Sequence, residues 1–149
     1  MVDGKNCPLE NKTLKLEILP EFSEIAKVTS LLRDFFHKHN FPTNYSNEIC
    51  LVVEELAVNT IMHGYKNIAV QNREKISVEI ECSNKKNKVS IIFRDTGIPF
   101  DPTLPRPARK EGTIGGWGLM LVKKIMHNFK YERSGKYNVL RLSKYYQET

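Results

Sequence analysis

The order in which hydrophobic periodicity changes along the chain constrains its fold more than any other feature. Residues 13–19 alternate apolar and polar side chains, which predicts a half-buried strand that ends before Pro20. Apolar residues then recur at three- and four-residue steps, which predicts two amphipathic helices, one over 22–39 and one from near Thr43 to Gly64. The chain therefore begins with one strand followed by two helices.

The rest of the chain groups its strands into hairpins. Two pairs of short apolar runs are each joined by a polar turn, residues 76–80 with 89–93 and residues 129–133 with 137–144. A long loop rich in glycine and proline and a third helical pattern, 117–128, lie between the two pairs. Strands grouped in this way predict an α+β two-layer sandwich, with a mixed, mainly antiparallel sheet and helices on one face.

Length and composition fit one globular domain over residues 1–149, with residues 1–12 expected to form a flexible N-terminal extension. Hydrophobic residues make up 40% and charged residues 27%, which excludes an intrinsically disordered chain. The three cysteines are odd in number and form no C-x-x-C pair, so we expect neither a disulfide framework nor a zinc site. The sequence has no signal-peptide pattern and no run of about 20 apolar residues, and we expect a soluble cytoplasmic protein without membrane contact.

The net charge of +6 favours an acidic partner or a phosphate ligand. The charge is spread along the chain, however, and no recognised recognition helix or aromatic sheet motif accompanies it. We therefore do not expect direct binding of nucleic acid.

Three short patterns could carry chemistry. Glu55 and Asn59 are four residues apart on the second predicted helix and so share one face, where an amide oxygen suits Mg²⁺ and a carboxylate can accept a proton. Asp95 and Gly97 follow a predicted strand, where a carboxylate can accept a hydrogen bond from an amine and glycine lets a flat ring approach. Taken singly, the first pattern also fits a solvated helix face and the second an ordinary turn.

The third pattern is a glycine cluster, Gly112 with Gly115, Gly116 and Gly118, placed directly before the third predicted helix. Backbone N–H groups of such a loop and the helix N-terminus can hold phosphate oxygens, although a simple glycine connection has the same composition. In this order, the three patterns resemble the N, G1 and G2 boxes of the ATPase superfamily of gyrases, chaperones, histidine kinases and mismatch-repair proteins. Their sequences are Glu55-x-x-x-Asn59 with His63-Gly64-Tyr65, Asp95-x-Gly97-x-Pro99-Phe100-Asp101-Pro102, and Gly116-x-Gly118-Leu119.

Within that superfamily, the short spacing and the Pro-Phe-Asp-Pro extension are most similar to stand-alone anti-sigma-factor serine kinases. The resemblance covers about residues 14–144 and implies the Bergerat ATP-binding fold. It implies that Asn59 holds Mg²⁺, that Glu55 is the general base, and that Asp95 binds the adenine amine. Pocket residues would be Gly97, Gly116, Gly118 and Leu119, and residues 101–115 would form a lid over ATP.

The same resemblance implies the function and the partners. The chain would use ATP and Mg²⁺ to phosphorylate a serine on a small antagonist protein, and would hold a sigma factor inactive when the antagonist is unavailable. The alternative is a non-catalytic, ATP-dependent binding module, against which the presence of Glu55 argues. A homodimer is also implied, for which Phe22, Ile25 and Leu31 could supply a contact or could simply belong to the core.

Two further expectations concern residues near these patterns. Glu54 points about 100° away from Glu55 on a helix, so we expect it to have only a surface or partner-contact role. The four histidines, His37, His39, His63 and His127, are expected to serve structure. In the last hairpin, related proteins often carry a threonine that helps to bind adenine, whereas this chain has Asn138 followed by Val139 and Leu140.

Overall fold

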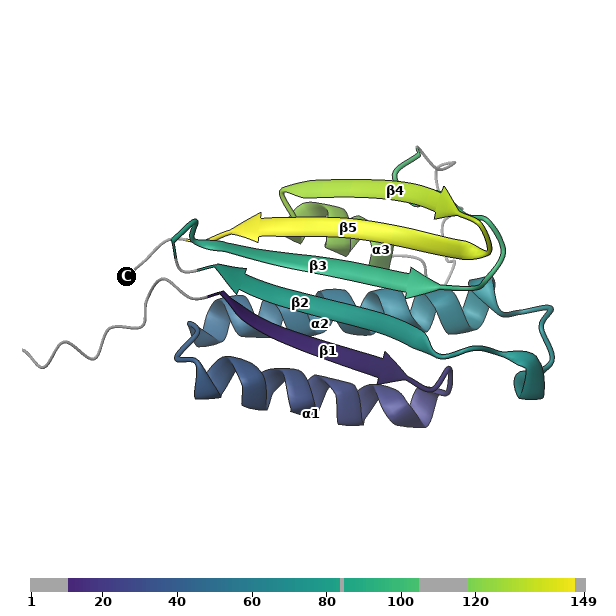
Figure 1. The fold of residues 1–149 in the computed structure, drawn as a ribbon, viewed down its shortest axis with the longest axis horizontal. Coiled ribbons are helices and arrows are strands. Elements are labelled where there is room, and N and C mark those ends of the chain that lie inside the picture. Colours follow the sequence, from purple (N-terminus) through teal and green to yellow (C-terminus); the bar gives the residue numbers. More distant parts are fainter. Residues whose placement is uncertain (1–10, 84, 105–117, 147–149) are drawn as a thin grey trace, which may run out of the picture.

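A computed structural model of the protein describes residues 11–83, 85–104 and 118–146. The described residues form two layers, a sheet and a set of helices (Figure 1). The strands are β1 (Lys12–Ile18), β2 (Ile76–Ser83), β3 (Lys88–Asp95), β4 (Asn128–Ser134) and β5 (Tyr137–Tyr145). The helices are α1 (Phe22–Lys38), α2 (Thr43–Asn59) and α3 (Gly118–Ile125), with short turns η1 (Thr60–Gly64) and η2 (Val70–Asn72).

The strand order is β1-β2-β3-β5-β4, and each neighbouring pair is antiparallel. The three helices lie on one face of the sheet, with α2 packed between α1 and α3 (Figure 1). The predicted α+β sandwich with helices on one face is therefore confirmed. Among the described strands the sheet is wholly antiparallel, because both predicted hairpins form and β3 then pairs with β5.

The core lies between the sheet and the apolar faces of α1 and α2. Buried residues of α2 recur at the predicted helical spacing, and alternate residues of β2 and β3 face them. On α1, Ile25 is buried in this core, whereas Phe22 and Leu31 are 57% and 50% exposed. The core residues of α2, β2 and β3 include Ile49, Val52, Val53, Leu56, Ile76, Val78, Ile80, Val89, Ile91 and Phe93.

Two helix ends differ from the sequence-based expectation. The second helix was expected to continue to Gly64, but its α-helical hydrogen bonding ends at Asn59 and a π-helical turn, η1, follows. Such a turn holds one extra residue and often occurs at functional sites. The third helix ends at Ile125 rather than near residue 128, because Asn128 pairs with Ser143 in the sheet and Lys144 Nζ donates to the Ile125 carbonyl.

Two further observations complete the fold. No helix in the described part of the chain is long and apolar enough to cross a bilayer. Cys50 and Cys82 are both buried and both free. Residues 1–10, which include most of the expected N-terminal extension, lie outside the described residues, and β1 begins at Lys12.

Candidate functional site

A pocket opens between the end of α2, the loop after β3, the start of α3 and the inner face of β5. Asn59 lies where α2 ends, and Asp95 is the last residue of β3. Leu119 closes the pocket from α3, and Asn138 and Leu140 line it from β5. The remaining lining residues come from α2, η1 and the loop after β3: Leu56, Thr60, His63, Gly64, Ile98, Phe100 and Pro102.

Asp95 places a carboxylate in this pocket with only 7% of the residue exposed. Its Oδ1 atom accepts hydrogen bonds from the Gly97 backbone N–H at 2.8 Å and from Asn138 Nδ2 at 3.0 Å. Burial raises the pKa of the Asp95 carboxyl, while the bonds from Asn138 and Gly97, the Arg133 charge and the Thr60 hydroxyl act in the opposite direction. The carboxylate is therefore desolvated and held in one orientation.

Asn138 occupies the position directly opposite Asp95 in the pairing of β3 with β5. Besides Asp95, its amide nitrogen reaches the carbonyl oxygens of Ile98 at 2.9 Å and Gly97 at 3.3 Å. Its Oδ1 atom accepts a 2.6 Å hydrogen bond from the Tyr131 hydroxyl. One asparagine thus joins the carboxylate, the loop that follows it and the neighbouring strand β4.

Gly97 is needed because two backbone segments touch at this point. A Cβ atom at position 97 would lie 2.8 Å from the carbonyl oxygen and 2.9 Å from the Cα atom of Gly64. The next residue, Ile98, donates its N–H to the same carbonyl oxygen at 3.1 Å. The contact brings the end of η1 against the loop after Asp95, so the glycine serves chain packing as well as leaving space in the pocket.

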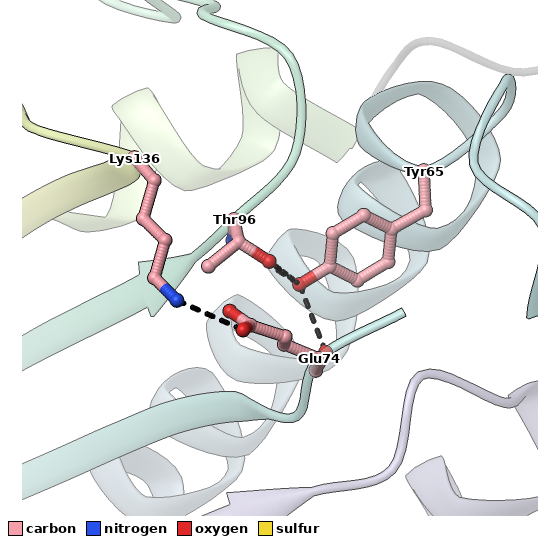
Figure 2. Close-up of polar contacts among 4 residues, drawn as sticks. All are labelled: Tyr65, Glu74, Thr96 and Lys136. Atoms are coloured by element: carbon pink, nitrogen blue, oxygen red, sulfur yellow. Dashed lines mark hydrogen bonds and ion pairs between the residues drawn. The ribbon is translucent and has the colours of Figure 1, made fainter. Parts of the chain in front are cut away.

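A buried tyrosine holds this loop from its other side (Figure 2). The Tyr65 side chain is fully buried, and its hydroxyl donates to the Glu74 carbonyl oxygen at 3.0 Å and accepts the Thr96 N–H at 3.2 Å. Burial raises the pKa of the Tyr65 phenol, which keeps it a neutral donor. Glu74 also pairs with Lys136 at 2.9 Å, which links the start of β2 to the turn between β4 and β5.

Glu55 lies one helical turn before Asn59 and is half-buried. Partial burial raises the pKa of the Glu55 carboxyl, and the negative charge of Glu54 raises it further. The Glu55 carboxylate packs against Gly118, because a Cβ atom at Gly118 would overlap Glu55 Oε2. Glu54 is exposed, as expected from its place on the helix.

The structure brings together most of the residues that the sequence patterns selected. Asn59, Asp95 and Leu119 line one pocket, Gly97 lies beside Asp95, and Gly118 lies against Glu55. Glu55 itself is not among the pocket-lining residues. Of the expected lid, the structure describes only positions 101–104. Gly116 and the lid from residue 105 onward lie outside the described residues.

Several pocket residues were missed by the sequence patterns. Thr60 and Ile98 line the pocket but belong to none of the carboxylate, amide and glycine positions that defined the patterns, so their residue type gave no signal. His63 was assigned to structure, yet it is an exposed residue that lines the pocket. Its place in the His63-Gly64-Tyr65 part of the first sequence pattern was the available signal.

Comparisons with known proteins bear on the fold and the family of the chain. In a structural search, the chain is similar to the crystal structure of the RsbU and RsbW domains of Rv1364c from Mycobacterium tuberculosis, with a TM-score of 0.64 and 15% sequence identity. The match covers 90% of this chain and 32% of that chain, so the protein spans about a third of the structure it resembles. A search of curated proteins found no match. Residues 19–144 match the histidine kinase-like ATPase domain, so the chain belongs to this family.

Proposed function

We propose that the protein binds ATP with Mg²⁺, transfers the terminal phosphate to a serine of a small antagonist protein, and sequesters a sigma factor when that antagonist is unavailable. The family supports ATP binding. The structural similarity to a protein that contains an RsbW domain supports the choice of an anti-sigma-factor kinase among the possible functions of histidine kinase-like ATPases. The observation that carries the proposal is a buried, oriented Asp95 carboxylate in the same pocket as Asn59, with Glu55 one helical turn away.

Asp95 is suited to select adenine. Its buried carboxylate can accept a hydrogen bond from the N6 amine of ATP, whereas the O6 atom of GTP would present a second acceptor. Apolar side chains of Leu56, Ile98 and Leu140 line the same pocket and can cover a flat ring. The pocket therefore combines one polar selector with an apolar lining.

The residues present fit a magnesium ion that is held jointly by protein and phosphates. Mg²⁺ is commonly bound through one or two protein ligands, with phosphate oxygens and water completing its shell. The described residues contain no cluster of three or more His, Cys, Asp or Glu side chains that would form an all-protein site. Asn59 would hold the ion through its amide oxygen, and the bound ion would neutralise charge on the phosphates.

Glu55 distinguishes a kinase from a binding module. A general base must be ionised near neutral pH and must accept a proton from the attacking hydroxyl, and a pKa raised from its usual value strengthens the carboxylate as a base. A module that only binds ATP has no need for this partly buried carboxylate against Gly118. We therefore place the proton of the serine hydroxyl on Glu55 during transfer.

The test is incubation of the full chain with γ-labelled ATP, Mg²⁺ and a lysate of the source cell. We expect one small protein to acquire the label, and we expect phosphoamino-acid analysis to find phosphoserine. Glu55→Gln keeps the shape of the side chain but removes the proton acceptor, so ATP binding should remain and transfer should fall by roughly 10²–10⁴-fold.

Glu54→Gln is the matched control, because Glu54 is the exposed neighbour on the same helix. Its transfer activity should be largely retained, because the change keeps the Glu55 carboxylate and removes only the Glu54 charge that helps to raise the pKa of Glu55. If Glu55→Gln transferred phosphate at the rate of the unmodified protein, Glu55 would be excluded as the base. Tight ATP binding without transfer to any protein would instead favour the non-catalytic module.

A further inference from the structure

The face of the sheet opposite the helices carries a shallow depression over β3, β5 and β4. Side chains alternate along a strand, and the residues between the buried core positions of β3 point to this outer face. Ser90 of β3, Ser143 of β5 and Asn128 of β4 are direct cross-strand partners and form one row across it. Asn128 Nδ2 donates to Ser143 Oγ at 2.9 Å, so the Ser143 hydroxyl keeps its own proton for another acceptor.

Cations flank this polar row on both sides. Lys88 lies two residues before Ser90 on β3, while Arg141 on β5 and Lys130 on β4 are cross-strand partners on the other side of the row. Lys88 Nζ lies 5.7 Å from the centre of the Tyr145 ring, a cation–π contact that leaves its charge uncompensated. Among the described residues, no ion pair involves Lys88, Lys130 or Arg141.

The charge of the outer face changes sign at the neighbouring strand. Glu79 and Glu81 on β2 face outward beside Ile92 and Ser90 of β3, whereas on β1 Lys15 lies opposite Glu79 and Glu17 pairs with Lys75. A long polyanion such as a nucleic acid would be repelled where it left the depression and crossed these carboxylates. The uninterrupted positive area is therefore short, and it favours a short anionic segment.

We propose that this depression is a docking surface for an acidic segment of a partner protein. Carboxylates of the segment would pair with Lys88, Lys130 and Arg141 and accept hydrogen bonds from the hydroxyls of the floor. A second copy of this chain is a poorer occupant in a symmetric contact, since Lys88, Lys130 and Arg141 of the two copies would then face one another. Asp95 and Asn138 face the other side of the sheet, so a partner could dock here without covering the nucleotide pocket.

The test measures binding of a fluorescein-labelled oligoglutamate peptide to the full chain by fluorescence anisotropy, with an oligoglutamine peptide for comparison. We expect binding that weakens as salt is raised. The triple variant Lys88→Gln, Lys130→Gln, Arg141→Gln should bind roughly tenfold more weakly or worse, since several exposed ion pairs are lost together.

A second triple variant, Arg33→Gln, Lys38→Gln, Lys66→Gln, removes the same charge from exposed positions outside the depression. It should bind within about twofold of the unmodified protein, because its cations do not line the depression. Equal weakening in both triple variants would overturn the proposal by showing that only net charge matters. Thermal melts of both variants establish that each one is folded.

NMR titration of the ¹⁵N-labelled chain with the same peptide locates the site. Shifts at the amides of Ser90, Asn128 and Ser143 are expected, and Asp95→Asn should leave them unchanged even if it abolishes ATP binding. Shifts confined to the nucleotide pocket would overturn the proposal. Competition provides a further check: the proposal would fail if inorganic phosphate or a single-stranded oligonucleotide displaced the peptide when it supplied fewer negative charges than the peptide does. It would also fail if sedimentation showed that the depression mediates self-association.

Discussion

Asn138 and Asp95 face each other across the β3–β5 pair and share a 3.0 Å hydrogen bond from the amide nitrogen to Oδ1 of the carboxylate. The amide cannot rotate freely, because its oxygen accepts from Tyr131 and its nitrogen also donates to the Ile98 carbonyl. The N–H groups of the Asn138 amide already donate to acceptors within the protein. Asn138 therefore acts on a ligand through Asp95, as a positioning residue.

Replacement of Asn138 by alanine should weaken both ATP binding and folding. The change leaves the carbonyl of Ile98 and the hydroxyl of Tyr131 without this partner, and an unsatisfied buried polar group destabilises a protein by about 1–3 kcal/mol. We expect roughly tenfold weaker ATP binding in calorimetry and a lower urea midpoint. Asn128→Ala, on the outer face of β4, is the control and should bind ATP normally. Unchanged affinity in Asn138→Ala would remove the positioning role.

Asp95→Asn should abolish selective ATP binding and yet stabilise the empty protein at neutral pH. Because burial raises the folded-state pKa of Asp95 above its usual value of 3.8, the native state binds more protons than the unfolded state between these two pKa values. Wild-type stability therefore falls as pH rises through this window, relative to Asp95→Asn.

Thermal melts of the two proteins across the acidic range check this sign. The midpoint of Asp95→Asn should exceed that of the wild type at pH 7, and the difference should disappear below pH 3.8, where the carboxyl is protonated in both states. A variant that is less stable at pH 7 would mean that the hydrogen bonds from Asn138 and Gly97 outweigh the cost of burial.

Gly97→Ala should destabilise the fold and disturb the pocket together. The added Cβ atom would lie under 3.0 Å from backbone atoms of Gly64, and backbone cannot move aside as a side-chain tip can. We expect a loss of about 2 kcal/mol or more in urea unfolding, and weaker ATP binding.

Gly135→Ala supplies the comparison for this variant. Gly135 has a φ of +59° in the β4–β5 turn, with open space around it, so alanine there strains the backbone of a turn that does not line the pocket. It should lower stability without changing ATP affinity. If both glycine variants keep full affinity, the Gly64–Gly97 contact does not shape the pocket.

The buried thiols should be chemically inert in the native state. Burial raises the pKa of the Cys82 thiol to about 12, and burial also raises the pKa of the Cys50 thiol. The reactive thiolate is therefore scarce at neutral pH. In a Cys7→Ser background, a thiol reagent should label the native protein slowly and the urea-unfolded protein rapidly. Rapid labelling of the native protein would show that these core positions open to solvent.

Sequence patterns predicted the fold well because periodicity reports burial directly. The alternation of β2 and the three- and four-residue steps of α2 place the same residues in the core that the structure buries. Sequence patterns fail to predict where a helix ends when tertiary contacts determine that end. The π-helical turn after Asn59 ends at Gly64, whose carbonyl accepts the Ile98 N–H, and α3 ends at Ile125, whose carbonyl accepts Lys144 Nζ; both partners are far away in the chain.

The candidate site was predicted by residue type and spacing, which identify Asn59 and Asp95 but not the residues that orient them. Asn138 is 43 residues away from Asp95, and only the β3–β5 register makes the two neighbours. Tyr65 was noted as part of a motif, but its buried hydroxyl bond to the Glu74 carbonyl depends on the path of the chain. Long-range pairing of this kind leaves no local signal in the sequence.

Gly118→Ala provides a test of how Glu55 is held. Alanine is the better helix former by about 1 kcal/mol, so the change alone should not weaken α3. Its Cβ atom would, however, overlap the Glu55 carboxylate, a flexible side-chain end that can swing away at little energetic cost. We therefore expect a protein of normal or higher thermal stability in which Glu55 is displaced and phosphotransfer is strongly reduced.

A double-mutant cycle separates this effect from damage to nucleotide binding. If the loss acts only through Glu55, Gly118→Ala should reduce transfer in the wild-type background but have no further effect in Glu55→Gln, where the base is already absent. ATP affinity from calorimetry should change much less than the transfer rate. An equal, additive loss in both backgrounds would show that Gly118 contributes to phosphate binding itself, and would leave the position of Glu55 independent of the start of α3.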